Sequence, residues 1–144
     1  MKLANLAAGL IAILALCAAQ DTHAQSRAKA DVTCKSTGQK LQYDCIIKLA
    51  NTKTNEPMSG LTLMMGADTP SMPGMHNVRP VKAAEEAEKG TYKAQIMLEM
   101  HGDWAVRLDL SGGVRDRVIK MMSFEGDKVG EAKPAQAPGR HKRH

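Results

Sequence analysis

The chain is poor in aromatic side chains: its 144 residues include one Trp, two Tyr and one Phe, together 3% of the sequence. Aromatic side chains usually supply much of the buried area of a core. Ten methionines are present instead, and methionine is a flexible residue that fills irregular core space. We therefore expect methionine to occupy part of the core.

The sequence also lacks an apolar run long enough to be a convincing membrane span. Lys2 precedes a short apolar stretch that ends in small residues around Cys17, which is typical of a secretory signal peptide. We assign it to residues 1–24, with cleavage after Ala19 as an alternative, and expect a periplasmic or secreted protein without a stable span after cleavage. A lipoprotein anchored at Cys17 is disfavoured by the large Leu16 before it, and an uncleaved N-terminal anchor is the remaining alternative.

Cysteine is scarce, and no Cys-x-x-Cys motif suggests a redox pair or a cysteine-ligated metal. Removal of the signal peptide leaves Cys34 and Cys45, and an even pair in an exported chain indicates a disulfide. The intervening Ser36–Gln39 has turn chemistry, so a hairpin would place the two sulfurs opposite each other. This pairing argues against a blue-copper site, which needs a free thiolate with two histidines.

The net charge of +5 comes from 20 basic and 15 acidic residues. The excess is concentrated after Asp127, where Lys, Pro, Ala, Gly and His follow without periodicity. We interpret residues 126–144 as a disordered basic tail and residues 25–30 as a flexible leader. A basic tail suits an anionic membrane surface or nucleic acid, but export argues against nucleic acid, and a merely solvated tail explains the charge.

Hydrophobic residues alternate with polar ones through most of residues 31–125, and turn signals recur every eight to twelve residues. Only Ala83–Lys89 has helical propensity, and we prefer a strand and a turn there because its flanks read as β. The pattern predicts an all-β, immunoglobulin-like β-sandwich of about seven strands. The expected strands are Asp31–Ser36, Leu41–Leu49, Leu61–Met65, Val78–Lys82, Tyr92–Met100, Trp104–Leu110 and Val114–Phe124.

Residues 66–77 contain two prolines and two glycines, which predict a long loop. This loop carries Met72-Pro73-Gly74-Met75-His76, and Met97-Leu98-Glu99-Met100-His101 repeats its Met-x-x-Met-His pattern. Thioether sulfur with imidazole is a soft ligand set of the kind that selects Cu(I). The competing interpretation is core packing, which applies most to Met65 and Met100 on apolar strand faces.

Strand direction predicts that the two patterns meet. If successive strands alternate in direction, the strands that end before residues 66–77 and at Met100 finish at the same end of the sandwich. Met121 and Met122 approach that end as well, whereas Met58 lies at the other end. The candidate metal ligands are Met72, Met75, His76, Met100 and His101.

An ordered set of motifs resembles the YtkA-like and FixH-like domains over roughly residues 30–124. These motifs are Met72-Pro73-Gly74-Met75-His76, Gly90-Thr91-Tyr92 and Met100-His101-Gly102-Asp103-Trp104. The resemblance implies an immunoglobulin-like sandwich outside the cytoplasmic membrane, linked to metal-cation handling or copper-oxidase assembly. The motif includes Met72, Met75, His76 and Met100, whereas His101 lies outside its fixed positions.

Two functions fit these features. The first is an exported module that binds or delivers copper, as Cu(I), to a copper-handling or oxidase-assembly membrane protein. The second is a metal-free accessory module for a membrane protein such as a cation transporter or an oxidase assembly system, with the methionine loop as an adaptable contact. We do not expect an enzyme, because the sequence has no Ser-His-Asp ordering and no acidic pair in a clear setting.

Overall fold

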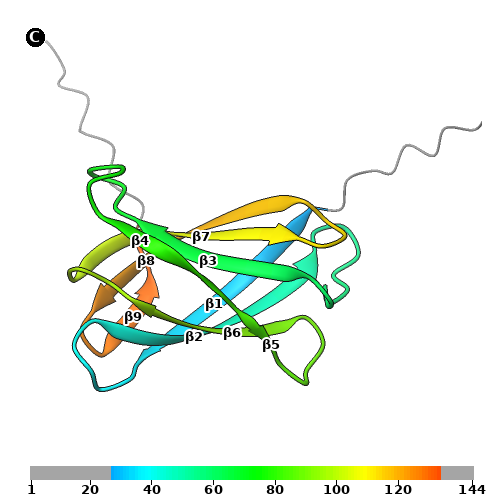
Figure 1. Cartoon of the computed structure of the whole chain (residues 1–144), viewed down its shortest axis with the longest axis horizontal. Coiled ribbons are helices and arrows are strands. Elements are labelled where there is room, and N and C mark those ends of the chain that lie inside the picture. Colours follow the sequence, from blue (N-terminus) through cyan, green and yellow to red (C-terminus); the bar gives the residue numbers. More distant parts are fainter. Residues whose placement is uncertain (1–26, 134–144) are drawn as a thin grey trace, which may run out of the picture.

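The computed structural model describes residues 27–133, which form two antiparallel sheets packed face to face (Figure 1). One sheet has the order β1-β2-β6-β5 and the other β4-β3-β7-β8-β9. The four strands of the first sheet are β1 (Ala28–Ser36), β2 (Gln42–Asn51), β6 (Thr91–Met97) and β5 (Ala84–Glu85). The five strands of the second are β4 (Asn77–Lys82), β3 (Thr62–Asp68), β7 (Gly102–Ser111), β8 (Asp116–Glu125) and β9 (Lys128–Glu131).

This arrangement confirms the predicted all-β sandwich. The first sheet has the A-B-E-D order of immunoglobulin-type domains, and the connections β2–β3 and β6–β7 cross between the sheets, as in those domains. The strand and turn preferred for residues 83–89 are present, since β5 pairs with β6 and a turn follows it. The signal peptide assigned to residues 1–24 lies outside the described residues.

The core contains all four aromatic side chains of the protein, each 1% exposed or less: Trp104, Tyr43, Tyr92 and Phe124. The rings of Tyr43 and Phe124 meet edge to face, with centroids 4.8 Å apart. Met65 and Met122 fill space beside them, at 0% and 2% exposure. The expectation that methionine replaces part of the missing aromatic volume is therefore confirmed for these two residues.

Cys34 and Cys45 form the predicted disulfide. They face each other in the register of β1 and β2, with their Cα atoms 4.0 Å apart. Ser36 Oγ accepts a hydrogen bond from the backbone N–H of Gly38, which has a positive φ of 86° and supports the turn between the two strands. The described residues therefore offer no free thiolate to a metal.

The predicted leader, residues 25–30, is wrong at its C-terminal end, because β1 begins at Ala28. Ala28 and Ala30 pair with Asn51 and Leu49 in β2. The backbone N–H of Ala28 also donates to the carboxylate of Asp116, at 2.8 Å. Pairing on one side and this contact on the other extend the strand beyond the hydrophobic alternation from which it was predicted.

The predicted disordered tail, residues 126–144, is also wrong in part, because Lys128–Glu131 form β9. Gly126, with a positive φ of 64°, and Asp127 make a two-residue turn between paired Glu125 and Lys128. Val129 then lies opposite Phe124 in the register. A short hairpin with one apolar residue leaves little periodicity to detect, and the rest of the predicted tail, residues 134–144, lies outside the described residues.

Two predicted boundaries next to the methionine segments also change. The loop expected at residues 66–77 begins later, because β3 continues to Asp68, which pairs with Ala105 in β7. The strand expected to reach Met100 ends at Met97, whose partner Gln42 is the last in that ladder. The first change shortens the loop that carries Met72 and Met75, whereas the second places Met100 in the β6–β7 connection rather than in a strand.

Candidate metal site at one end of the sandwich

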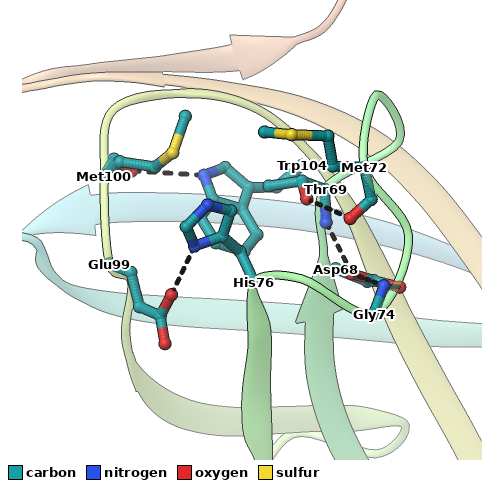
Figure 2. A network of polar contacts seen from close by, with 8 residues as sticks. All are labelled: Asp68, Thr69, Met72, Gly74, His76, Glu99, Met100 and Trp104. Carbon is teal, nitrogen blue, oxygen red and sulfur yellow. Dashed lines mark hydrogen bonds and ion pairs between the residues drawn. The ribbon is translucent and has the colours of Figure 1, made fainter.

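The β3–β4 loop is held in a defined shape by the residues at its start. Asp68 Oδ1 accepts hydrogen bonds from the backbone N–H groups of Thr69, at 2.9 Å, and Gly74, at 3.1 Å (Figure 2). The buried Thr69 donates its hydroxyl hydrogen to the carbonyl of Met72, at 3.0 Å. Because Asp68 ends a paired strand and Thr69 follows it directly, the loop that carries Met72 and Met75 is fixed to the sheet at its base.

The β6–β7 connection lies beside this loop and is anchored independently. The backbone N–H of buried Leu98 donates to the carbonyl of Leu41, at 2.8 Å. The indole Nε1–H of Trp104 donates to the carbonyl of Met100, at 3.2 Å. The segment between these two contacts contains Glu99, which is thus held at a nearly fixed backbone position.

One side-chain contact joins the two segments. His76 Nδ1 lies 2.6 Å from Glu99 Oε2, and the His76 side chain is 33% exposed. This contact confirms the strand-direction argument that brought the two Met-His segments to one end of the molecule. β4 and β5 act as one returning segment that changes sheet at Ala83, so the alternation of direction is preserved.

Three methionine side chains at this end are exposed to solvent rather than packed in the core. Met72 is 46% exposed, Met75 73% and Met100 40%. In the view of Figure 2, the thioethers of Met72 and Met100 flank the Trp104 indole, and the His76 ring turns its second nitrogen, Nε2, toward the same side. Core packing therefore does not explain these residues.

The prediction that Met100 lies on a core face is wrong. The alternation of β6 stops at Met97, and the next core position is taken by Leu98, which is 3% exposed. Met100 follows in the connection, where strand periodicity no longer applies. Met122, expected near the site, is buried and lies opposite Trp104 in the register, while Met121 is 40% exposed on the outer side of β8.

His101, also predicted as a ligand, makes a contact outside the His76–Glu99 pair. Its Nδ1 accepts a hydrogen bond from the backbone N–H of Gly126, at 3.2 Å, in the β8–β9 turn. This contact occupies Nδ1 in the present arrangement. We interpret His101 as a support for that turn.

Sequence reasoning missed Glu99. The alternation of β6 assigned it to the solvent-facing side of a strand, where a carboxylate needs no special explanation. The available signal was its position, since it lies immediately before Met100 and strand direction brings that connection to the His76 loop.

The chemistry of this end is that of soft donors. Within residues 27–133, no three His, Cys, Asp or Glu side chains are grouped as a metal site. A metal held there would depend on thioether sulfur together with His76, and this combination fits Cu(I) better than zinc, calcium or magnesium. The same residues contain no helix long and apolar enough to cross a membrane.

These features define a small, disulfide-bridged, two-sheet β-domain with a methionine-rich loop at one end. The chain belongs to the YtkA-like family, whose model matches residues 23–109. This confirms the YtkA-like resemblance inferred from the motifs, and the matched region contains Met72, Met75, His76 and Met100. No curated protein and no solved structure matches the chain.

Proposed function

We propose that this YtkA-like protein is an exported module that binds Cu(I) and delivers it to a membrane protein of copper handling or oxidase assembly. The proposed site lies at the end of the sandwich formed by the β3–β4 loop and the β6–β7 connection, the Met72 end. The proposed ligands are Met72, Met100 and His76 Nε2, with Met75 as a further thioether. The role is binding and transfer rather than catalysis. Export rests on the signal peptide assigned to residues 1–24.

One observation carries the proposal: two exposed thioethers and the available nitrogen of His76 face the same side at one end of the sandwich (Figure 2). Exposed methionine side chains have hydrophobic area that burial would stabilise, so their placement at the surface calls for a reason. Each of the two loops is tied to the sheets by buried residues, which limits the ordering needed to form a metal site.

The same exposure suits delivery. Met75, the most exposed of the three at 73%, can reach a ligand group on a partner while the deeper ligands still hold the metal. A site of few, soft ligands at an open end leaves a coordination position free for exchange. Transfer would then proceed through shared coordination between the two proteins.

The test is a competition titration of the purified protein with Cu(I) and a chromophoric chelator, without oxygen and with ascorbate to keep the metal reduced. We expect one Cu(I) per chain. Replacement of Met72 and Met100 together by leucine, which preserves size and hydrophobicity, should weaken binding at least about a hundredfold, equivalent to about 2.7 kcal/mol. Met121→Leu is the matched control, because Met121 is as exposed as Met100 but lies on the outer side of β8.

Unchanged affinity in the Met72→Leu, Met100→Leu variant, or an equal loss in the control, would refute the site. An absence of Cu(I) binding would favour the second function, a metal-free accessory module. The observation that supports this alternative is the group of exposed methionines at this end, which includes Met97 at 60% exposure. Flexible methionine surfaces adapt well to protein partners.

A further inference from the structure

Glu99 contacts the one histidine of the proposed site through the nitrogen that faces away from the thioethers. The Nδ1–Oε2 distance is 2.6 Å, which places the two atoms within hydrogen-bond distance. An ionised carboxylate can only accept hydrogen bonds. The proton of a neutral His76 ring must therefore sit on Nδ1, which leaves the lone pair on Nε2.

We infer that Glu99 is a positioning residue of the copper site: it selects the Nδ1–H tautomer of His76 and aims Nε2 at the metal. The inference rests on the proposed function and names a residue that acts on the ligand without touching the metal. Carboxylates that accept a hydrogen bond from the far nitrogen of a ligating histidine commonly fix its tautomer and orientation.

The backbone around Glu99 gives it the rigidity that this role requires. The preceding Leu98 is buried and bonded to Leu41, and the carbonyl of the following Met100 is held by the Trp104 indole. On the other side of the contact, His76 follows a loop that Asp68 closes. Two independently anchored segments thus meet at a single hydrogen bond, so the direction of the ring is set before any metal binds.

The negative charge of Glu99 makes a smaller contribution to Cu(I) binding. Two thioethers and a neutral imidazole carry no charge, so a bound Cu(I) would leave the site with one positive charge that Glu99 offsets. The Glu99 side chain is 55% exposed, however, and solvent strongly screens charges at such positions. The choice of tautomer is therefore the main effect, and removal of such a partner commonly weakens metal binding about tenfold to a hundredfold.

The test begins without copper. At pH of about 9, where imidazole is neutral, long-range hydrogen–nitrogen correlation NMR on the full chain reports which ring nitrogen of His76 carries the proton. We expect Nδ1–H in the wild-type protein. Glu99→Gln should allow a mixture of tautomers, because an amide offers both a donor and an acceptor, and should weaken Cu(I) binding about tenfold.

Glu88→Gln is the matched control, since Glu88 forms an exposed ion pair with Lys48, at 3.3 Å, away from the Met72 end. It should change neither the His76 tautomer nor the affinity. If Glu99 merely tied the two loops together, Glu99→Gln would keep both the wild-type tautomer and the wild-type affinity, and the inference would be wrong. A wild-type ring in the Nε2–H form would also overturn it.

The outcomes separate this inference from the function on which it depends. A wild-type protein that binds Cu(I), with the same affinity in Glu99→Gln, removes the role of Glu99 alone. A wild-type protein that binds no Cu(I) removes the proposed function and this inference together. A tautomer shift with a matching loss of affinity supports both.

Discussion

At both ends of the sandwich a side chain donates a hydrogen bond to the backbone carbonyl of a methionine, but the methionine side chains differ in burial. At the end that contains Met58, Gly90 and Tyr92, the Tyr92 end, the buried Tyr92 hydroxyl donates to the carbonyl of Met58, at 3.1 Å. At the Met72 end, Thr69 and Trp104 donate in the same way to the carbonyls of Met72 and Met100. The Met58 side chain packs against the core, whereas those of Met72 and Met100 stay exposed.

The difference lies in what surrounds each anchored methionine. The Tyr92 end is closed by backbone contacts, since the Met58 N–H and the carbonyl of Gly90 both bond to Leu49. At the Met72 end, the contacts secure the base of each loop and leave the side chains free. A fixed backbone with an exposed thioether suits the metal-binding loop that we propose. At the Tyr92 end the same kind of hydrogen bond accompanies a packed side chain, where it contributes to stability.

The largest expected effect comes from matched glycine substitutions at the two ends. Gly90 and Gly74 have similar positive φ values, 73° and 81°. A Cβ on Gly90 would lie 2.8 Å from the Leu49 carbonyl oxygen, whereas a Cβ on Gly74 meets nothing within 4 Å. Gly90→Ala should lower the free energy of unfolding by about 3 kcal/mol, because strain and overpacking add, and Gly74→Ala by about 1 kcal/mol.

Urea denaturation of both variants measures this difference directly. Equal losses would mean that the two ends do not differ in packing as described. The Gly74→Ala variant also provides a folded protein in which the shape of the methionine loop is disturbed, so its Cu(I) affinity can be measured without a large loss of stability.

A smaller effect is expected from removing the buried hydroxyls. Tyr92→Phe removes the hydrogen bond to Met58 and the one that Tyr92 accepts from the Leu61 N–H, at 3.2 Å. It should cost about 2 kcal/mol, and Thr69→Val, which removes one such bond, about 1 kcal/mol. Thermal unfolding gives the stabilities, and only Thr69→Val should weaken Cu(I) binding. Weaker Cu(I) binding in Tyr92→Phe would contradict the separation of the two ends.

The stability of the protein at alkaline pH, measured by urea denaturation, provides a second test of the Tyr92 hydroxyl. Burial raises the pKa of Tyr92 above its ordinary value of 10.0; the hydrogen bond from the Leu61 N–H partly offsets this rise, and nearby Glu85 adds to it. The folded state therefore holds this proton more tightly than the unfolded state, so stability is full below pH 10 and falls as the pH rises above it. Tyr92→Phe should reduce this fall and leave the part due to Tyr43, whose pKa burial also raises.

The sequence was sufficient for those parts of the fold in which a local pattern and a long-range pairing agree. Alternation in the strand that contains Tyr43 and Ile47 predicted which side chains are buried, and the spacing of Cys34 and Cys45 predicted their bridge. Strand direction predicted that the methionine segments meet. These inferences depend on period and chain reversal, which a sequence displays directly.

One prediction was wrong because the sequence does not show at which residue strand pairing ends. Nothing in the alternation of Tyr92–Met100 shows that pairing ends at Met97, so Met100 was assigned to the core face. The contacts of Glu99 and His101 were not predicted for a different reason, since each is made with a segment more than twenty residues away. Such contacts are set by tertiary geometry and leave no local signal.

The smallest effect is expected from truncating an exposed methionine at the Met72 end. Met75→Ala should change the free energy of unfolding by less than about 0.5 kcal/mol, because its side chain is 73% exposed and gains little from folding. Met58→Ala, which removes a side chain that packs against the core, should cost about 1–2 kcal/mol. Denaturant unfolding of the two variants beside the wild type measures both values. A Met75→Ala loss as large as that of Met58→Ala would show that the loop methionines stabilise the fold, and would remove the reason for assigning them a binding role.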